Sequence, residues 1–223
     1  IDEAVTLTQG PIGDELIQNT IKSAGVRILG WSYSGFRRLS NSKRPITKPA
    51  DLKGLTIRVP KNAIMIDSYK SWGVSPTPMA WDEVFTALQQ KVLDGQDTPL
   101  ITQYVMKFYE VQKYITKIRY VFLLEPLVIS EQLFQRQSPE IQQVLLRAGK
   151  EAQEFCRQFL ILFEDSIENE LKGKGLEIMD PADGEKEWIE KATQTVWPKF
   201  YKSIGGKEKV DAALKAINRE FPF

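Results

Sequence analysis

Arg58 is the side chain whose setting best suits chemistry, because it ends a β-rich run in the segment RPITKPADLKGLTIRVP over residues 44–60. Residues 51–54 read as a turn, residues 55–59 alternate like a strand, and Pro60 ends that strand. A guanidinium near the end of a strand lies where open α/β sheets bind ligands, and its planar fork matches a carboxylate. An ordinary surface arginine in an ion pair is the alternative.

Residue types that are missing from the sequence exclude several kinds of chemistry. There is no histidine, which removes the usual general base, the Ser-His triads and most zinc sites. The single cysteine, Cys156, cannot form an intramolecular disulfide or a metal cluster, and its place on an apolar helical face predicts a buried core residue. No glycine-rich nucleotide loop is present. We therefore expect no metal and no cofactor, and no catalytic residue is assigned, since no pair of carboxylates stands out by its spacing.

Length and composition fit an ordinary soluble globular protein. The 223 residues are enough for one large or two smaller domains, and 42% of them are hydrophobic and 26% charged. No apolar run is long enough to span a bilayer, and no export signal is visible at the start of the chain. The net charge of +1 argues against a nucleic-acid partner.

Basic residues are concentrated in one stretch, where Asp51 is the only acid among them. A local positive field of this kind favours an anionic partner, whereas a solvated basic face balanced by acids elsewhere is the alternative. The stretch contains Arg27, Arg37, Arg38, Lys43, Arg44, Lys48, Lys53, Arg58 and Lys61.

Strand and helix patterns alternate through the first half of the chain. Apolar spacing, glycines that end helices and prolines that favour extended backbone define the elements. The expected order is a helix over 14–24, a strand over 26–33, a helix over 62–72, an extended connector over 75–79, a helix over 82–91, a short strand over 93–95 and a helix opened by Thr98 as its cap and Pro99. This alternation predicts a parallel or mixed sheet flanked by helices.

The second half contains a β-rich segment and one very long helix. Residues 115–124 read as a long strand, which Glu125-Pro126 bends before a further strand segment over 127–130. A helix then runs from 139 to 173, about 35 residues or roughly 50 Å. Its apolar stripe fits either a coiled-coil dimer or a helix that runs along two lobes of one molecule. The compact α/β surroundings and the lack of a charged pattern beside the stripe favour the second interpretation.

Three long blocks of sequence carry a family resemblance. They are RPITKPADLKGLTIRVP at 44–60, SPTPMAWDEVFTALQQKVLDGQDTPL at 75–100 and KFYEVQKYI at 107–115. In motif and in spacing they resemble the DctP-type solute-binding proteins of tripartite ATP-independent periplasmic (TRAP) transporters, and the resemblance runs from about residue 10 to the C-terminus. It implies an α/β fold of the periplasmic-binding-protein type, with two α/β lobes, a hinge and a long helix spanning both.

The resemblance also implies three main substrate-binding residues. Arg58 matches the arginine that holds the substrate carboxylate at two points. Arg37, with Arg38 beside it, matches a second arginine of the pocket. Trp81, in PMAWDEV, takes the aromatic position that covers the ligand, although a core aromatic is the alternative.

Three further residues complete the predicted site. Thr98 stands where many members have asparagine, and a helix cap is its alternative role. Tyr120 stands where several members have a polar hinge residue, often histidine, and hinge packing is its alternative role. Asn62, at the start of the helix that follows Arg58, is also expected to contact the ligand.

Compared with the family, the chain is expected to lack the N-terminal part of the first lobe. Residues 1–34 and 124–163 would be the remainder of that lobe, and residues 35–123 and 164–223 would form the second lobe. The remainder offers little sheet to cover the first half of the long apolar stripe, so we expect exposed apolar surface there.

The function that these features imply is binding, not catalysis. We expect a periplasmic protein, monomeric when full length, that captures a small organic acid between two lobes and delivers it to the membrane subunits of a TRAP transporter. An enzyme acting on a carboxylate substrate through an Asp/Glu pair is the alternative, and a helix-mediated dimer would rest on the stripe alone. Sugar acids, keto acids, dicarboxylates and aromatic acids all stay open as ligands.

Overall fold

The computed structural model describes residues 1–220, which divide into two compact units. Unit 1 contains Ile1–Gly35, Phe122–Phe163 and Ala212–Glu220, and unit 2 contains Phe36–Val121 and Glu164–Asp211. The sequence analysis placed 164–223 together in the second lobe, whereas 212–220 group with unit 1, where Arg219 Nε donates to Glu3 Oε1 at 2.7 Å. Residues 221–223 lie outside the described residues.

Unit 2 is built on a mixed six-stranded sheet with the order β4-β3-β5-β2-β6-β8. Strands β3–β4, β3–β5 and β6–β8 pair in parallel, and β2 pairs antiparallel with β5 and β6. The strands are β2 (Arg38–Asn41), β3 (Ile57–Val59), β4 (Thr77–Pro78), β5 (Gly95–Thr98), β6 (Tyr114–Thr116) and β8 (Glu177–Met179). The predicted α/β class with a mixed sheet is confirmed.

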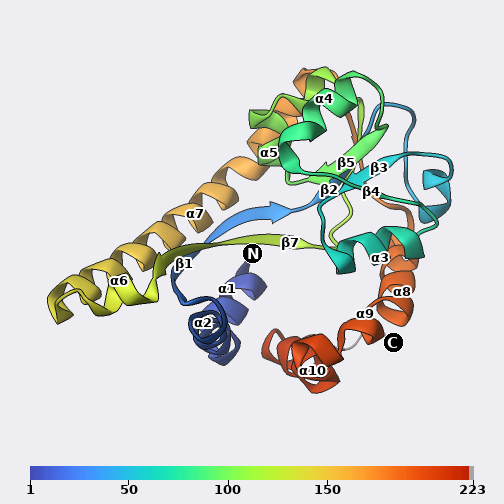
Figure 1. The fold of residues 1–223 in the computed structure, drawn as a ribbon. Helices are drawn as coiled ribbons and strands as arrows, with labels where there is room; N and C mark the ends of the chain where they lie inside the picture. The colour runs from blue at the N-terminus through green and yellow to red at the C-terminus, as the bar shows by residue number, and fades with distance from the viewer. Residues whose placement is uncertain (221–223) are drawn as a thin grey trace. The chain divides into compact units, whose positions relative to one another are not determined.

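Helices cover both faces of this sheet (Figure 1), with α3 and α8 on one side of the strands and α4 and α5 on the other. Side chains alternate along a strand, so neighbouring residues enter different cores. Leu39 packs with Trp72 and Trp188 on the α3 and α8 side, and Ile115 packs with Leu100 and Leu171 on the other. The helical segments are η1 (Pro49–Leu52), α3 (Ala63–Ser71), η2 (Trp81–Glu83), α4 (Val84–Gln89), α5 (Leu100–Val105), η3 (Phe108–Glu110), η4 (Ala182–Glu185), α8 (Lys186–Thr195), α9 (Trp197–Phe200) and η5 (Lys202–Ile204).

The turn that leads into β3 has the form that the sequence predicts. The Asp51 carboxylate accepts hydrogen bonds from two preceding backbone N–H groups, at 2.9 and 3.1 Å. Gly54 has a φ of 79°, in the left-handed region that favours glycine. Arg44 closes the segment by donating to two backbone carbonyls of the same turn. These contacts fix where β3 begins, and therefore where Arg58 lies.

Unit 1 combines a two-stranded sheet, β1 paired with β7, with several helices. Arg27 on β1 makes a two-point ion pair with Glu131, with both N–O distances at 2.7 Å. Cys156 was predicted to be a core residue, but it is only half-buried, and the Ser32 hydroxyl donates to its sulfur at 3.6 Å. The elements are α1 (Asp2–Gln9), α2 (Pro11–Ala24), β1 (Val26–Phe36), β7 (Phe122–Ser130), α6 (Glu131–Gln135), the first part of α7 and the end of α10 (Lys207–Ala216).

Helix α7 (Pro139–Gly173) has 35 residues, as the sequence predicts, and contributes 139–163 to unit 1 and 164–173 to unit 2. Within the described part of unit 1, β1 and β7 are the only strands. Phe155 and Leu162 are accordingly 69% and 70% exposed, which confirms the expected exposed apolar surface. None of the described helices, α7 included, is long and apolar enough to cross a membrane.

Two strand predictions were wrong in position. The strand expected over 93–95 is β5, over 95–98, because Asp94 instead accepts a hydrogen bond from the backbone N–H of Thr56 at 2.9 Å. The long strand expected over 115–124 is interrupted at 117–121, where backbone carbonyls accept side-chain hydrogen bonds. Strand β7 then runs through Pro126 without a break. Each strand of a two-stranded sheet has one edge without a partner strand, and a proline whose nitrogen faces that edge removes no hydrogen bond between the strands.

A close crossing of β1 and α7 in unit 1 depends on two glycines. A Cβ on Gly149 would lie 2.2 Å from the Leu29 carbonyl oxygen, and one on Gly30 would lie 2.3 Å from the Gly149 carbonyl oxygen. We expect Gly149→Ala to lower the free energy of unfolding by about 1–3 kcal/mol, because backbone atoms cannot yield as a side chain can. Urea unfolding followed by tryptophan fluorescence measures the change, since Trp31 lies in the same strand.

Gly173→Ala is the matched control in the same helix, because a Cβ there meets nothing within 4 Å. That variant should be neutral or more stable by up to about 1 kcal/mol, the gain of alanine over glycine in a helix. Equal effects of the two substitutions would show that the crossing does not depend on Gly149.

Candidate ligand-binding site

Arg58 lies in the middle of β3 and is buried. Its Nε and Nη2 both donate to the carbonyl oxygen of Met79, at 3.1 and 2.8 Å. This single acceptor occupies the edge of the guanidinium formed by Nε and Nη2. No described residue accepts a hydrogen bond from Nη1. The end of the guanidinium formed by Nη1 and Nη2 therefore keeps the geometry that binds a carboxylate at two points. Among residues 1–220, Arg58 makes no ion pair.

Trp81 stands directly beside Arg58, as expected for two residues of one site. The Arg58 guanidinium carbon lies 5.6 Å from the centre of the Trp81 ring. The indole also makes an edge contact with Phe108, with 5.7 Å between ring centres, yet it stays 38% exposed. An exposed aromatic ring held beside a buried cation can cover a bound acid and shield its carboxylate from water.

Arg37, in contrast, is paired within the protein. Its Nε and Nη2 donate to the two carboxylate oxygens of Asp97 at 3.0 and 3.2 Å, and Nη2 also donates to the Asp97 carbonyl. Both side chains are buried. Among the described residues, none accepts a hydrogen bond from Nη1 of Arg37. The predicted contact between Arg37 and the ligand stays a prediction.

Tyr120 joins the same cluster from the segment between β6 and β7. Its hydroxyl donates to Asp97 Oδ2, and its ring makes edge contacts with Tyr69 and Trp72. Burial raises the pKa of the Tyr120 hydroxyl well above its ordinary value, and the nearby Asp97 charge raises it further. Tyr120 is therefore a neutral donor that helps to hold Asp97 in place.

The two arginines differ in how their charges are compensated. Burial by itself lowers the pKa of Arg37, but the ion pair and hydrogen bonds to Asp97 outweigh burial and raise the pKa above its ordinary value. The pKa of Arg58 is lowered, mainly by burial and also by Arg37, because the attraction of Asp97 is too weak to offset both. Arg58 is thus a buried cation whose charge the protein only partly balances, and an anionic ligand would stabilise it.

Thr98 and Asn62 take mainly structural positions. Thr98 is buried in β5 opposite Arg38, and its helix-cap prediction was wrong, since α5 begins after Pro99 and has no side-chain cap. Thr98 stays in the sheet ladder, so the helix can start only beyond it. Asn62 is exposed and caps α3, where its Oδ1 accepts a hydrogen bond from the Met65 backbone at 3.2 Å. Ligand contacts of both residues stay predictions.

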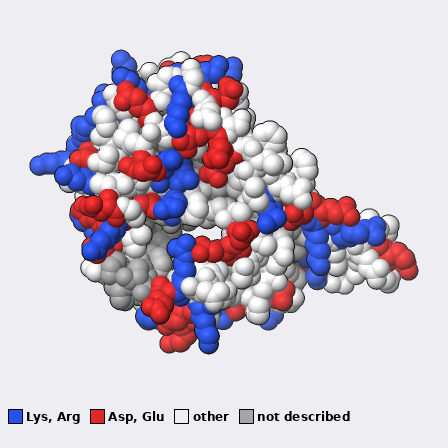
Figure 2. All heavy atoms as spheres, turned by 180° about the vertical axis from the view of Figure 1, so that it is seen from behind, with Lys and Arg blue, Asp and Glu red and all other residues white. Residues whose placement is uncertain are grey.

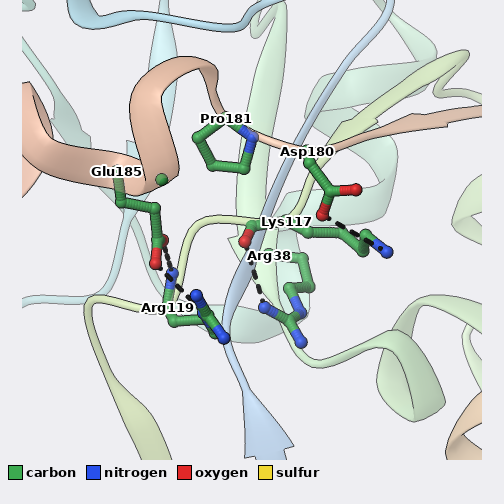
Figure 3. A pocket seen from close by; sticks show the side chains of 7 residues that line it. Arg38, Lys117, Arg119, Asp180, Pro181 and Glu185 are labelled. Atoms are coloured by element: carbon green, nitrogen blue, oxygen red, sulfur yellow. Dashed lines mark hydrogen bonds and ion pairs between the residues drawn. The ribbon is translucent and has the colours of Figure 1, made fainter.

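A cavity of about 320 Å³ in unit 2 is lined by Arg38 and six other residues (Figure 3), and none of the six predicted site residues lines it. Its cations face carboxylates: Arg38 pairs with Glu164 at 3.4 Å, Lys117 with Asp180 at 3.4 Å and Arg119 with Glu185 at 3.0 Å. Arg38 also donates to two backbone carbonyls, each at 3.2 Å. Arg38 thus holds the backbone at residues 117 and 118 in place, a structural role that differs from those of Arg37 and Arg58.

Carboxylates within the protein partly compensate the basic stretch of the sequence, and the positive field expected from it stays a prediction. Arg27, Arg37, Arg38 and Lys43 each have a carboxylate partner in the structure. Figure 2 shows basic and acidic side chains interspersed over the face in view. Of the buried arginines in this stretch, Arg58 is the one without a carboxylate partner among the described residues.

Asp97 is the residue of this cluster that the sequence analysis missed. A buried arginine such as Arg37 requires a carboxylate, but the sequence contains 29 acidic residues and nothing in their spacing selects one. The position of Asp97 beside Thr98 in DGQDTP was the available signal. Among the described residues, no group of three or more potential metal ligands comes together.

Comparisons with known proteins agree on one kind of protein. Residues 2–204 match the sequence profile of DctP, described as bacterial extracellular solute-binding protein, family 7. A TRAP periplasmic solute-binding protein from Rhodobacter sphaeroides is similar in structure, with a TM-score of 0.81 and 41% identity over 97% of this chain and 70% of that one. Another from Roseobacter denitrificans, solved with bound L-galactonate, has a TM-score of 0.79 and 33% identity over 89% of this chain and 67% of that one.

A curated relative adds a further ligand. The 2,3-diketo-L-gulonate-binding periplasmic protein of Escherichia coli is 32% identical over 78% of this chain and 53% of its own length. The chain thus spans about half the length of the curated relatives that it matches. The structural likeness confirms the predicted periplasmic-binding-protein type of α/β fold with a long helix.

Proposed function

Because the chain belongs to bacterial extracellular solute-binding protein family 7, we propose that it serves a TRAP transporter by binding a small organic acid at Arg58. The observation that carries the proposal is the buried guanidinium of Arg58, which is held at one side by the Met79 carbonyl and makes no ion pair among the described residues. Burying a cation is costly unless an anion accompanies it, so the bound acid would supply the missing charge.

The ligands of similar proteins support this assignment. L-galactonate and 2,3-diketo-L-gulonate, named for two relatives, are both hydroxylated carboxylic acids. In this chain Arg58 would bind the carboxylate at two points, Trp81 would cover it, and the free nitrogen of Arg37 and the side chains of Thr98, Tyr120 and Asn62 would face the remainder of the ligand.

The other parts of the proposal follow from the family. The two units correspond to two lobes of a periplasmic binding protein, which acts as a monomer and hands its ligand to membrane subunits. Its role is to bind the acid and release it unchanged, without catalysing a reaction.

Two measurements test the proposal directly. Mass spectrometry of small molecules that co-purify with the protein identifies the acid, and calorimetry then measures the stoichiometry of its binding. One acid bound per chain and recovered unchanged is the expected result. Chemical turnover of the acid would favour an enzyme instead, and failure to bind any carboxylate would overturn the proposal.

Trp81 should report ligand binding by fluorescence. A bound carboxylate would neutralise the cation beside the indole and displace water from its exposed part, so the emission should change in intensity or wavelength. Trp81→Phe should abolish most of the change, because Trp72 and Trp188 are buried in the core of unit 2. A signal that survives this substitution intact would remove Trp81 from the site.

A further inference from the structure

Within the described residues the chain passes between the two units at four places. The boundaries fall at 35/36, 121/122, 163/164 and 211/212. Near the first boundary β1 gives way to β2, and before the second the residues 117–121 belong to no helix or strand. At the third boundary α7 continues unbroken. Any change in the arrangement of the two units must bend the chain at these connections.

Arg38 contacts three of the four connections from within unit 2. It is the third residue of unit 2 after the first boundary. Its Nη1 donates to the carbonyl oxygens of Lys117 and Ile118, each at 3.2 Å, in the segment before the second boundary. Its Nη2 lies 3.4 Å from Oε1 of Glu164, the first residue of unit 2 after the third boundary. One buried side chain therefore joins three connections where they enter or leave unit 2.

Two further features show that polar contacts hold this junction. The Arg37 backbone N–H donates to the Val121 carbonyl at 2.9 Å, which links the first connection to the second. The cavity of about 320 Å³ borders Lys117 and Arg119, so close packing is absent on that side of the segment. The hydrogen bonds and the ion pair of Arg38 are thus well placed to decide how freely the connections move.

We infer that Arg38 is a positioning residue that governs how readily the connections bend, and that it thereby sets ligand affinity without being a predicted ligand contact. The inference rests on the proposed function, in which the two units are lobes that close over the acid. With Arg38 in place, three connections leave unit 2 as one fixed group. Without it each connection would fluctuate separately, and closure would cost more conformational entropy.

Hydrogen exchange followed by NMR tests the local role without any ligand. In Arg38→Met the Arg37 amide, which bonds the Val121 carbonyl, should exchange about three- to tenfold faster, because local opening governs its rate. The Asp94 amide, which donates to the Thr56 carbonyl at 2.8 Å, should keep its rate. An unchanged Arg37 rate overturns the inference. Equal acceleration of both amides would show a general loss of stability and also overturns it.

Glu164→Gln provides a second variant that removes only the contact with α7. The Glu164 side chain is 37% exposed, so the variant should fold, and it should accelerate exchange at Arg37 less than Arg38→Met does. Glu151→Gln is the matched control, since Glu151 pairs with Arg147 on the same helix. If Arg38→Met does not fold, these two variants decide, and equal exchange rates in both overturn the inference.

L-galactonate and 2,3-diketo-L-gulonate, the acids named for two relatives, test the effect on binding. For an acid that binds, stopped-flow fluorescence of Arg38→Met should show faster dissociation, and the dissociation constant should rise about two- to thirtyfold at unchanged stoichiometry. An unchanged dissociation constant in the folded variant overturns the inference and leaves the proposed function standing. If neither acid binds, the acid identified by mass spectrometry takes their place. Failure of every carboxylate to bind overturns the proposed function, and the exchange rates then decide the role of Arg38.

Discussion

Replacing Arg58 with lysine is expected to weaken binding of the acid by about 2–5 kcal/mol, or roughly 30- to 4,000-fold in the dissociation constant. Lysine keeps the charge but has no planar fork, so it cannot bind a carboxylate at two points or share the Met79 carbonyl as Arg58 does. Isothermal titration calorimetry measures the loss, and circular dichroism checks that the variant is folded.

The control is Arg147→Lys, the same chemical change at a position on α7 where the side chain is 70% exposed. This variant should bind the acid like the unaltered protein. Unchanged affinity in a folded Arg58→Lys protein would remove Arg58 from the site, whereas equal losses in both variants would point to a general effect on the protein.

Replacing Asp97 with asparagine is expected to lower the free energy of unfolding by about 3–5 kcal/mol, because it leaves the buried Arg37 charge without its carboxylate. The substitution preserves the shape of the side chain and therefore isolates the effect of its charge. Urea unfolding followed by tryptophan fluorescence measures the change, since Trp72 contacts Tyr120 with 5.1 Å between ring centres and lies in the same core.

The same measurement on Asp180→Asn should change stability by less than about 1 kcal/mol, because an exposed ion pair contributes little. Replacing both partners together, Arg37→Met with Asp97→Leu, should recover part of the loss, since neither charge of the pair is then left buried without its partner. A change below about 1 kcal/mol in Asp97→Asn would show that the buried pair does not hold this part of unit 2 together.

The two adjacent arginines illustrate the limit of sequence-based assignment. Arg37 and Arg38 are the same type of residue and adjacent in the sequence. Their side chains nevertheless lie in different surroundings, because successive side chains along extended backbone point to opposite sides. Arg37 enters the cluster with Asp97 and Tyr120, and Arg38 braces the segment that precedes β7 through carbonyl groups and Glu164. Which of the two arginines meets Asp97 depends on the pairing register of β2, which long-range contacts set.

Local patterns were sufficient where local physics dominates. The turn before β3 follows from Asp51 and Gly54, whose preferences act over a few residues. The boundaries of α7 follow from an apolar period that continues over 35 residues. Strand β7 continues across Pro126 without being divided, because whether a proline interrupts a strand depends on which of its edges is paired.

The sequence by itself determined the α/β class, the long helix, the strand that carries Arg58 and the family motifs around it, since each depends on residues that are near in the chain. Tertiary structure decided the chemistry of the site. Asp97 is 60 residues from Arg37 and 23 from Tyr120, and Met79 is 21 from Arg58. The strand order of the folded sheet fixes which carboxylate neutralises which buried guanidinium. It pairs Asp97 with Arg37 and leaves the buried Arg58 without a carboxylate partner among the described residues.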